Sequence, residues 1–277
     1  LAAGLLAGFG IAVARERLDR SVKSADRLGA LTGAPTLGVI CYDPKAAKRP
    51  LITHLEPRSP RTEAFRQLRT SLTFIDADAS AKSIVVTSCR PAEGKSTTVS
   101  NLAISLAQAG RRVLVVDADL RRPGLSGYLG VEGAVGLTDV LIGRASLVDV
   151  LQPWGDLPMR VLPSGPIPPN PSELLGSARM RTLLGRLTAI ADIVLFDAPP
   201  SLPVTDAIVL ARQCDGALLV VRQGVTHEEQ VRRVVGMLAG VDARLLGTVL
   251  NMAPGKEPYG YGYGYGPESG PTASRAG

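Results

Sequence analysis

Cysteine, histidine and aromatic residues are scarce in this 277-residue chain, and each shortage excludes a class of protein. The three cysteines, Cys41, Cys89 and Cys214, are widely spaced. They form neither a disulfide framework nor a metal-binding cluster, and they fit a reducing compartment. The two histidines, His54 and His227, have no metal-binding partner near them in the sequence. Aromatic residues make up 4% and do not alternate with basic residues, so no nucleic-acid partner is expected.

Apolar residues make up 45% of the chain, which is enough for the core of one sizeable α/β domain. The first apolar run, residues 1–14, would cover about 21 Å as a helix, less than the roughly 30 Å hydrocarbon core of a membrane. We interpret it as the truncated end of a transmembrane helix; an apolar core helix or a signal-peptide remnant is the alternative. The basic residues Arg15, Arg17, Arg20 and Lys23 follow directly, which predicts a plasma-membrane protein with this end in the cytoplasm, against an anionic lipid surface.

The most informative stretch is an apolar, β-branched run over residues 83–88, followed by a short loop and then by Gly94, Lys95, Ser96 and Thr97. A buried strand, a loop and a helix in this order are the context of a phosphate-binding P-loop. Loop N–H groups and the helix N-terminus would hold the phosphates. Lys95 would reach the β- and γ-phosphates, and Ser96 would offer its hydroxyl to Mg²⁺. The amphipathic pattern predicts a helix over residues 101–109.

Residues 15–60 look like a juxtamembrane connector and linker, with one short strand over residues 34–40. A helix is then expected over residues 63–75, capped by Thr62, with an apolar face. Glu63, Arg66 and Arg69 recur every three residues on another face. That charged stripe is either simply solvated or a contact between subunits.

Apolar strands then alternate with amphipathic helices through residue 251. Strands are expected over residues 112–117, 159–162, 192–197, 217–221 and 245–251, and helices over residues 171–190, 205–212 and 227–238. This alternation predicts an α/β, P-loop NTPase-like domain over residues 61–252, with a mostly parallel sheet covered by helices on both faces. Its ligand site should lie at the carboxyl ends of the strands.

Three aspartates stand at predicted strand ends: Asp117 and Asp119 after one strand, and Asp197 after another. A lone aspartate at a strand end usually caps a turn or helix. Three beside a P-loop indicate a site that holds Mg²⁺ and orients a nucleophile for phosphoryl transfer. In the last part, residues 253–277, Tyr259, Tyr261, Tyr263 and Tyr265 alternate with glycine, which predicts a disordered tail.

Together these motifs resemble those of the bacterial tyrosine kinases, the autokinases of capsular and exopolysaccharide export. The resemblance rests on residues 89–97, 115–123 and 197–200, and it covers essentially the whole chain. Glu63, Arg66 and Arg69 look like that family's oligomerisation motif. Residues 168–175 and 205–207 are similar to its internal signatures, and the tyrosine-rich tail is similar to its autophosphorylation cluster.

The resemblance implies an ATP- and Mg²⁺-dependent tyrosine autokinase, in which Lys95, Asp117, Asp119 and Asp197 are catalytic. Ser96, Asp119 and Asp197 would hold Mg²⁺, and Asp117 would accept the tyrosine proton. The ATP site would comprise Glu93, Gly94, Lys95, Ser96, Thr97 and Asn251. Asn251 would read adenine, although it is equally well explained as a strand cap.

The family also implies partners: a homo-oligomeric ring, an extracytoplasmic chain-length-regulator domain, the polysaccharide polymerisation and export machinery, and a tyrosine phosphatase. Two features depart from the pattern. Cys89 stands where the loop normally opens with a small residue, and Arg90 stands where partitioning ATPases carry a second lysine. Two other functions remain open: a membrane-surface ATPase switch of the MinD/ParA kind, and an assembly module in which ATP only orders a ring.

Overall fold

The computed structural model describes residues 19–46, 48–75 and 81–255. The expected transmembrane segment over residues 1–14 and the tail tyrosines Tyr259, Tyr261, Tyr263 and Tyr265 lie outside these ranges. Within the ranges, no helix has the length and apolar character needed to cross a membrane.

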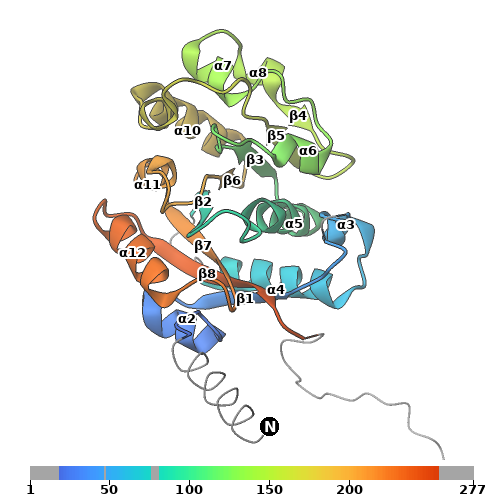
Figure 1. Cartoon of the computed structure of the whole chain (residues 1–277). Helices are drawn as coiled ribbons and strands as arrows, with labels where there is room; N and C mark the ends of the chain where they lie inside the picture. Colours follow the sequence, from blue (N-terminus) through green and yellow to red (C-terminus); the bar gives the residue numbers. More distant parts are fainter. Residues whose placement is uncertain (1–18, 47, 76–80, 256–277) are drawn as a thin grey trace, which may run out of the picture.

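An eight-stranded sheet forms the centre of the molecule (Figure 1). Its strand order is β1-β8-β7-β2-β6-β3-β5-β4, and every pair is parallel except β4 with β5. The strands are β1 (Thr36–Cys41), β2 (Ser83–Ser88), β3 (Val113–Asp117), β4 (Gln152–Pro153), β5 (Met159–Leu162), β6 (Ile193–Asp197), β7 (Gly216–Arg222) and β8 (Leu245–Ala253). The predicted mostly parallel sheet is therefore confirmed.

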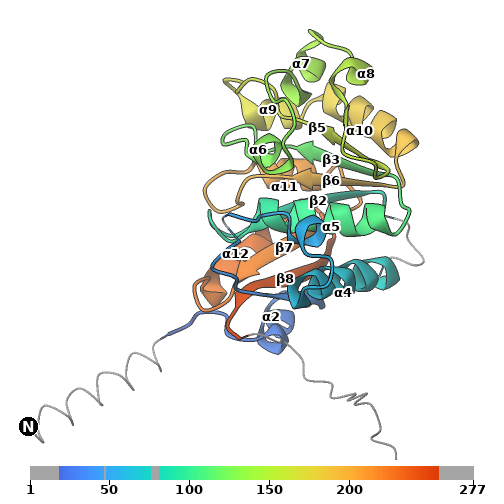
Figure 2. The same ribbon diagram turned by 90° about the vertical axis from the view of Figure 1, so that its right-hand side faces the viewer.

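Helices cover both faces of this sheet (Figure 2). One face carries α3 (Ile52–Leu55), α4 (Pro60–Ile75), α5 (Lys95–Gln108) and α6 (Leu125–Leu129). The other carries α2 (Ala25–Thr32), α7 (Leu137–Ile142), α8 (Leu147–Val150), α9 (Pro171–Leu175), α10 (Ala178–Ile190), α11 (Asp206–Ala211) and α12 (Glu228–Ala239).

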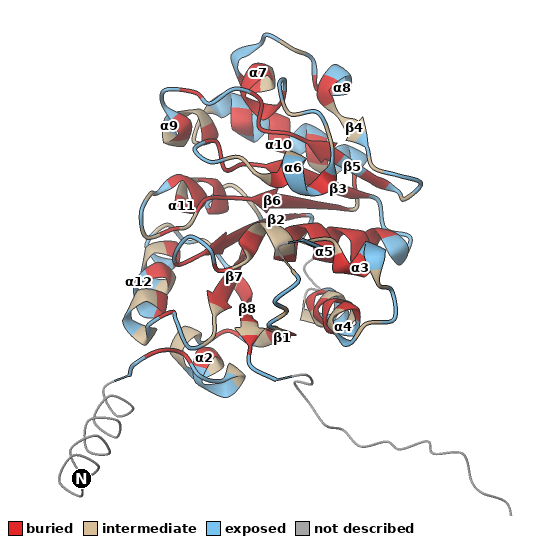
Figure 3. Ribbon diagram, turned by 45° about the vertical axis from the view of Figure 1, so that its right-hand side comes forward, coloured by how far each residue is buried: buried red, intermediate tan, exposed pale blue. Residues whose placement is uncertain are grey.

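Each central strand supplies side chains to both cores, because successive residues point to opposite faces. In β3, Val113 and Val115 enter one apolar cluster, whereas Leu114 and Val116 enter the other. Strands β2, β3 and β6 are buried along their whole length (Figure 3). This burial on both faces explains why the sequence shows continuous apolar runs there instead of an alternating pattern.

Three local predictions are wrong in detail. Helix α5 begins at Lys95, directly after the loop, and not at Asn101. The single helix expected over residues 171–190 is two helices, α9 and α10, which are separated at Gly176 and Ser177. The cap of α4 is Ser59, whose hydroxyl accepts the N–H of Thr62 at 3.1 Å.

Part of the expected connector is packed into the domain. Residues 36–41 form the edge strand β1, parallel to β8. Ser21 forms an antiparallel bridge with His227, and the buried Val22 joins the apolar core beside α12. The segment that follows residue 18 is therefore bound to the loop between β7 and α12.

Candidate active site

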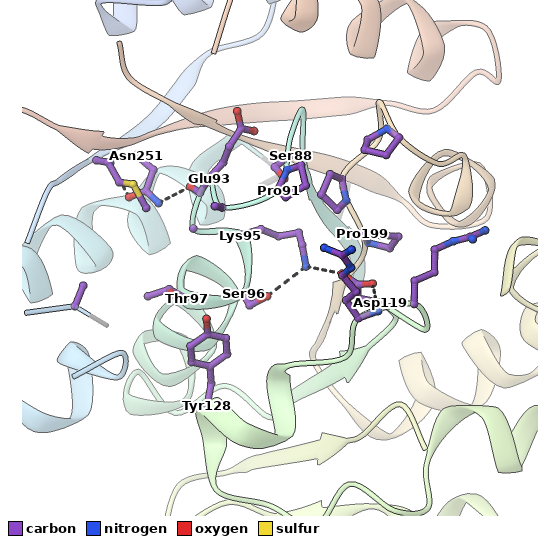
Figure 4. Close-up of a pocket in the computed structure, with 18 of the residues that line it drawn as sticks. Ser88, Pro91, Glu93, Lys95, Ser96, Thr97, Asp119, Tyr128, Pro199 and Asn251 are labelled. Carbon is purple, nitrogen blue, oxygen red and sulfur yellow. Dashed lines mark hydrogen bonds and ion pairs between the residues drawn. The ribbon is translucent and has the colours of Figure 1, made fainter. Parts of the chain in front are cut away.

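The phosphate loop, residues 89–94, joins β2 to α5 at the carboxyl edge of the sheet (Figure 4). Gly94 has a φ of 84° and Ala92 a φ of 63°, so both lie in the left-handed region. Gly94 is also confined by space, because a Cβ there would lie 2.1 Å from Asn251 Nδ2. Ala92 adopts a conformation that favours glycine, so its neighbours must hold it there. The loop delivers Lys95 to the first turn of α5, where free N–H groups and the helix dipole favour an anion.

Lys95 lies between two aspartates, one at the end of β6 and one in the loop after β3. Its ammonium donates to Asp197 Oδ1 at 2.5 Å and lies 3.7 Å from Asp119 Oδ2. It is also 3.3 Å from Ser96 Oγ. Asp197 Oδ2 is buried and receives no hydrogen bond from any residue that the structure describes. A buried carboxylate oxygen without a donor is unfavourable, so this atom marks a place for a cation or a donor.

Asp117 lies deeper than the other two carboxylates and is fully buried. Its Oδ2 accepts the N–H groups of Gly124 at 3.2 Å and Leu125 at 3.0 Å, and its Oδ1 accepts the N–H of Asp119. Burial, and next the neighbouring charge of Asp197, raise the pKa of Asp117 to about 7. Burial also raises the pKa of Asp119, while Lys95 opposes that shift. Neither Asp117 nor Asp197 is among the residues that line the cavity, so the roles of Asp117 as proton acceptor and of Asp197 as Mg²⁺ ligand stay predictions.

A cavity of about 710 Å³ opens above these groups. Its wall includes Glu93, Gly94, Lys95, Ser96, Thr97, Asp119, Arg121, Arg122, Tyr128, Pro199, Asn251 and Met252. The volume is within the range of small-molecule sites. Within the described part of the chain, no three acidic, histidine or cysteine side chains gather closely enough to hold a metal ion by themselves. Mg²⁺ usually keeps waters and takes phosphate oxygens as ligands, so Ser96, Asp119 and Asp197 fit Mg²⁺ brought in with a nucleotide.

Two residues expected to bind ATP make contacts within the protein. Asn251 Nδ2 donates to the backbone oxygen of Glu93 at 2.8 Å, and Asn251 Oδ1 accepts the N–H of Met252. The Glu93 carboxylate points away from Lys95 (Figure 4). It accepts hydrogen bonds from the N–H groups of Cys89 and Arg90 and from the hydroxyl of Thr226. Both residues line the cavity, yet their polar side-chain atoms shape the loop.

Sequence reasoning missed the structural reason for two of the internal signatures. Arg121 donates from Nε to Asp206 Oδ2 at 2.7 Å and from a terminal nitrogen to Asp206 Oδ1 at 3.0 Å. The Ser172 hydroxyl also donates to Asp206 Oδ1. Asp206 is fully buried, so this bidentate pair ties the loop after β3 to α9 and α11. The only hint of this pair in the sequence is Arg121, which follows the aspartates Asp117 and Asp119. Its partner Asp206 lies 85 residues away in the chain, so the sequence does not show that the two meet.

The charged stripe on α4 is partly engaged within the chain. Arg66 lies 3.1 Å from Glu63 and also donates to the backbone oxygen of Pro57. Arg69 donates to the backbone oxygen of Ser105 on α5 at 3.1 Å. Glu63 and Arg66 are therefore on the open side of the helix, whereas Arg69 reaches towards its neighbour.

Comparison with known proteins identifies the family. The sequence profile described as an AAA domain matches residues 81–225. The tyrosine-protein kinase YwqD of Bacillus subtilis is 43% identical over 204 residues, which cover 74% of this chain and 86% of YwqD. The chain belongs to the bacterial tyrosine kinases.

The kinase also resembles solved structures. The kinase domain of the Escherichia coli tyrosine kinase ETK superposes with a TM-score of 0.80 at 32% identity, and the match covers 87% of this chain and 99% of that domain. The septum site-determining protein MinD of Pyrococcus horikoshii, complexed with Mg-ADP, gives a TM-score of 0.53 at 28% identity, over 61% of this chain and 70% of that one. The kinase domain thus shares its fold with a nucleotide-binding protein.

Proposed function

We propose that this kinase transfers the γ-phosphoryl group of ATP, with Mg²⁺, to the tyrosines of its own tail, Tyr259, Tyr261, Tyr263 and Tyr265. The observation that carries the proposal is the position of Lys95 between Asp119 and Asp197, with one buried Asp197 oxygen lacking a donor among the described residues. Phosphoryl transfer requires a cation beside the phosphates, which Lys95 would supply. It also requires carboxylates that bind Mg²⁺, which Asp119 and Asp197 would supply. The membership in the tyrosine kinase family supports tyrosine as the acceptor.

In this proposal, Lys95 neutralises charge on the phosphates, and Ser96, Asp119 and Asp197 hold Mg²⁺. The ion supplies charge neutralisation at the phosphates when bound. Gly94, Thr97 and the backbone of Glu93 would hold the phosphates, and Asn251 lines the cavity next to Glu93, to whose backbone oxygen it donates. Asp117, whose pKa is raised to about 7 by burial, is suited to receive the tyrosine proton near neutral pH.

The tail begins close enough to the site for transfer within or between chains. The four tyrosines lie four to ten residues beyond Gly255, a reach of about 13 to 35 Å when extended. Glycine between the tyrosines lets the backbone enter a cleft without side-chain clashes. We favour transfer between chains, because the family resemblance implies a ring of subunits.

The test mixes two variant chains, one without a working site and one without tail tyrosines. One chain carries Lys95→Met and keeps its tail, and the other keeps its site but has phenylalanine at all four tail tyrosines. With ATP and Mg²⁺, the Lys95→Met chain is expected to gain phosphotyrosine, mapped by mass spectrometry. If it gains none while the wild type does, transfer between chains is wrong; if the wild type gains none, the kinase proposal itself fails.

Assembly of the ring is proposed to use Glu63, Arg66 and Arg69. Alanine at Arg66 and Arg69 should leave monomers in light scattering, whereas alanine at the exposed Gln67 on the same helix should not. Each arginine is also replaced singly, since Arg66 already bonds to Pro57 and Arg69 to Ser105 within the chain. Unchanged assembly in both arginine variants would mean that the stripe is only solvated.

The proposed setting follows from the same family. The kinase domain would lie on the cytoplasmic face of the plasma membrane, against anionic lipid, and act on capsular or exopolysaccharide polymerisation and export. Its partners would be an extracytoplasmic chain-length-regulator domain and a tyrosine phosphatase. An ATPase switch without kinase activity is the second candidate, favoured by the likeness to MinD. Phosphotyrosine mapping separates the two, because a switch would hydrolyse ATP and leave the tail unmodified.

A further inference from the structure

Glu93 places a carboxylate inside a loop that must receive phosphates, which calls for an explanation. Negative charge beside a phosphate site is unfavourable, yet Glu93 is only 2% exposed and lies directly before Gly94. Its side chain is turned to the side of the loop away from Lys95 (Figure 4). There its Oε2 accepts the N–H of Cys89 at 2.8 Å and of Arg90 at 3.0 Å. The carboxylate therefore closes the loop upon itself.

This closure compensates for two unusual residues in the loop. Cys89 stands at the opening position, and Ala92 has a φ of 63°, where glycine would be at ease. A non-glycine residue persists in such a conformation only when the surrounding structure holds it. The two N–H bonds to Glu93 span residues 89–93 and fix the backbone on both sides of Ala92.

Thr226 completes the arrangement from a distant part of the chain. Its hydroxyl donates to Glu93 Oε1 and accepts the N–H of Arg222 at 3.2 Å. Thr226 is fully buried, and 133 residues separate it from Glu93. Asn251, at the end of β8, holds the backbone oxygen of the same glutamate. The loop after β7 and the C-terminal part of β8 thus hold Glu93 on the side away from Lys95.

We propose that Glu93 and Thr226 act as a pair of positioning residues, which hold the phosphate loop in the shape that accepts a nucleotide. The inference rests on the proposed function only for the identity of that nucleotide. The Glu93 carboxylate is turned away from Lys95, and Thr226 is not among the residues that line the cavity, so both act through the backbone of residues 89–94. Loss of the pair lets the loop relax at Ala92 and weakens nucleotide binding more than it slows transfer.

The test removes the Thr226 hydroxyl while keeping its shape. Thr226→Val should raise the dissociation constant and the KM for ATP with Mg²⁺ about tenfold or more, the size expected for losing a hydrogen bond to a charged group. The kcat should change much less. Thr226→Ser, which keeps the hydroxyl, should restore both constants to within about twofold of the wild type.

The matched control is Thr248→Val. Thr248 is also fully buried and loses a side-chain hydrogen bond, although to a neutral group, the Thr36 hydroxyl at 3.1 Å. This variant should show a comparable fall in Tm with an unchanged KM. If Thr248→Val raises the KM as much as Thr226→Val does, the effect is general destabilisation and the proposal is overturned.

Glu93→Gln provides a second test if Thr226→Val does not fold. Glutamine keeps the size but offers one acceptor oxygen, so nucleotide binding should weaken, and Thr226→Val should add little in the double variant. The proposal is overturned if Glu93→Gln binds ATP as tightly as the wild type. It is also overturned if the effects of Glu93→Gln and Thr226→Val on the dissociation constant simply add in the double variant. The dissociation constants for ATP are measured independently of kinase activity. A wild type that binds ATP but forms no phosphotyrosine refutes the kinase function, and the pair is still tested.

Discussion

Buried carboxylates lie on both sides of the phosphate loop, and the two sides differ in how fully they are hydrogen bonded. On the side that faces Lys95, Asp197 receives one bond from Lys95, and its other oxygen has no donor among the described residues. On the opposite side, both oxygens of Glu93 are bonded, to two N–H groups and one hydroxyl. A fully bonded acid fixes a backbone, whereas an incompletely bonded one is ready to bind something else. The contrast separates a carboxylate that holds the loop from one that still has an oxygen without a donor among the described residues.

Lys95→Met should have the largest effect, because it removes the cation on the cavity side. Phosphotyrosine formation is expected to fall by at least about 100-fold, the usual cost of losing a group that stabilises transferred charge. Circular dichroism should show a retained fold. The control is Lys82→Met, since Lys82 is exposed at the opposite end of β2. Activity that survives in Lys95→Met would contradict the site.

Asp197→Asn tests whether the incompletely bonded carboxylate of Asp197 binds Mg²⁺, and the measurement is the change in Tm when Mg²⁺ and ADP are added. Mg²⁺ with ADP is expected to raise the Tm of the wild type by several degrees, because a ligand that binds only the folded chain stabilises it. The part of this gain that depends on Mg²⁺ should disappear in Asp197→Asn.

The comparison variant for this experiment is Asp206→Asn. Asp206 is as buried as Asp197, but Arg121 and Ser172 already bond to it. Its replacement should lower the starting Tm and leave the Mg²⁺-dependent gain intact. Equal gains in the two variants would remove the distinction between the two kinds of carboxylate.

The smallest expected effect is a pH dependence that comes from Asp117. Its pKa is raised from 3.8 to about 7 by burial and by Asp197, so the folded chain binds more protons than the unfolded chain between those values. The free energy of unfolding contributed by this group therefore falls as the pH rises through that window. Between about pH 5 and pH 7, the Tm of the wild type should fall relative to that of Asp117→Asn.

Asp192→Asn is the control for this slope. Hydrogen bonds from Arg112 lower the pKa of Asp192 to about 2, so its titration ends below the window. Wild type and Asp192→Asn should therefore give parallel Tm curves there. Parallel curves for Asp117→Asn as well would mean that Asp117 titrates normally in the folded chain.

The sheet could be predicted because its signal is local. Runs such as residues 84–86 and 193–196 are continuously apolar, which is the pattern of a strand buried on both faces. The short helices α6, α7 and α8 were not predicted, since each has four to six residues and too few turns for a periodic pattern. Helix α5 was predicted to begin too late, because Ser96, Thr97 and Thr98 are weak helix formers that the phosphate loop holds in a helix.

The site was predictable in part for the same reason. Lys95, Asp119 and Asp197 were expected together. In the structure, Lys95 Nζ lies within 3.7 Å of an oxygen of each aspartate, because the strands that precede these residues end at the same edge of the sheet. The outward turn of Glu93 was not predictable, because its partner Thr226 is a single threonine in a distant loop. No sequence pattern distinguishes a loop residue that faces a ligand from one that faces the protein.

The pairing of Ser21 and Val22 with the loop between β7 and α12 has a thermodynamic consequence. Val22 donates its N–H to the backbone oxygen of Thr226 at 2.8 Å, and its own oxygen accepts the N–H of Gly224. Thr226 therefore bonds through its hydroxyl to Glu93 in the phosphate loop, and through its backbone oxygen to Val22. Linkage between two binding events is reciprocal. If docking of Val22 strengthens nucleotide binding by some factor, the bound nucleotide strengthens the docking of Val22 by the same factor. The amide of Val22 would then report on the occupancy of a site that it never touches.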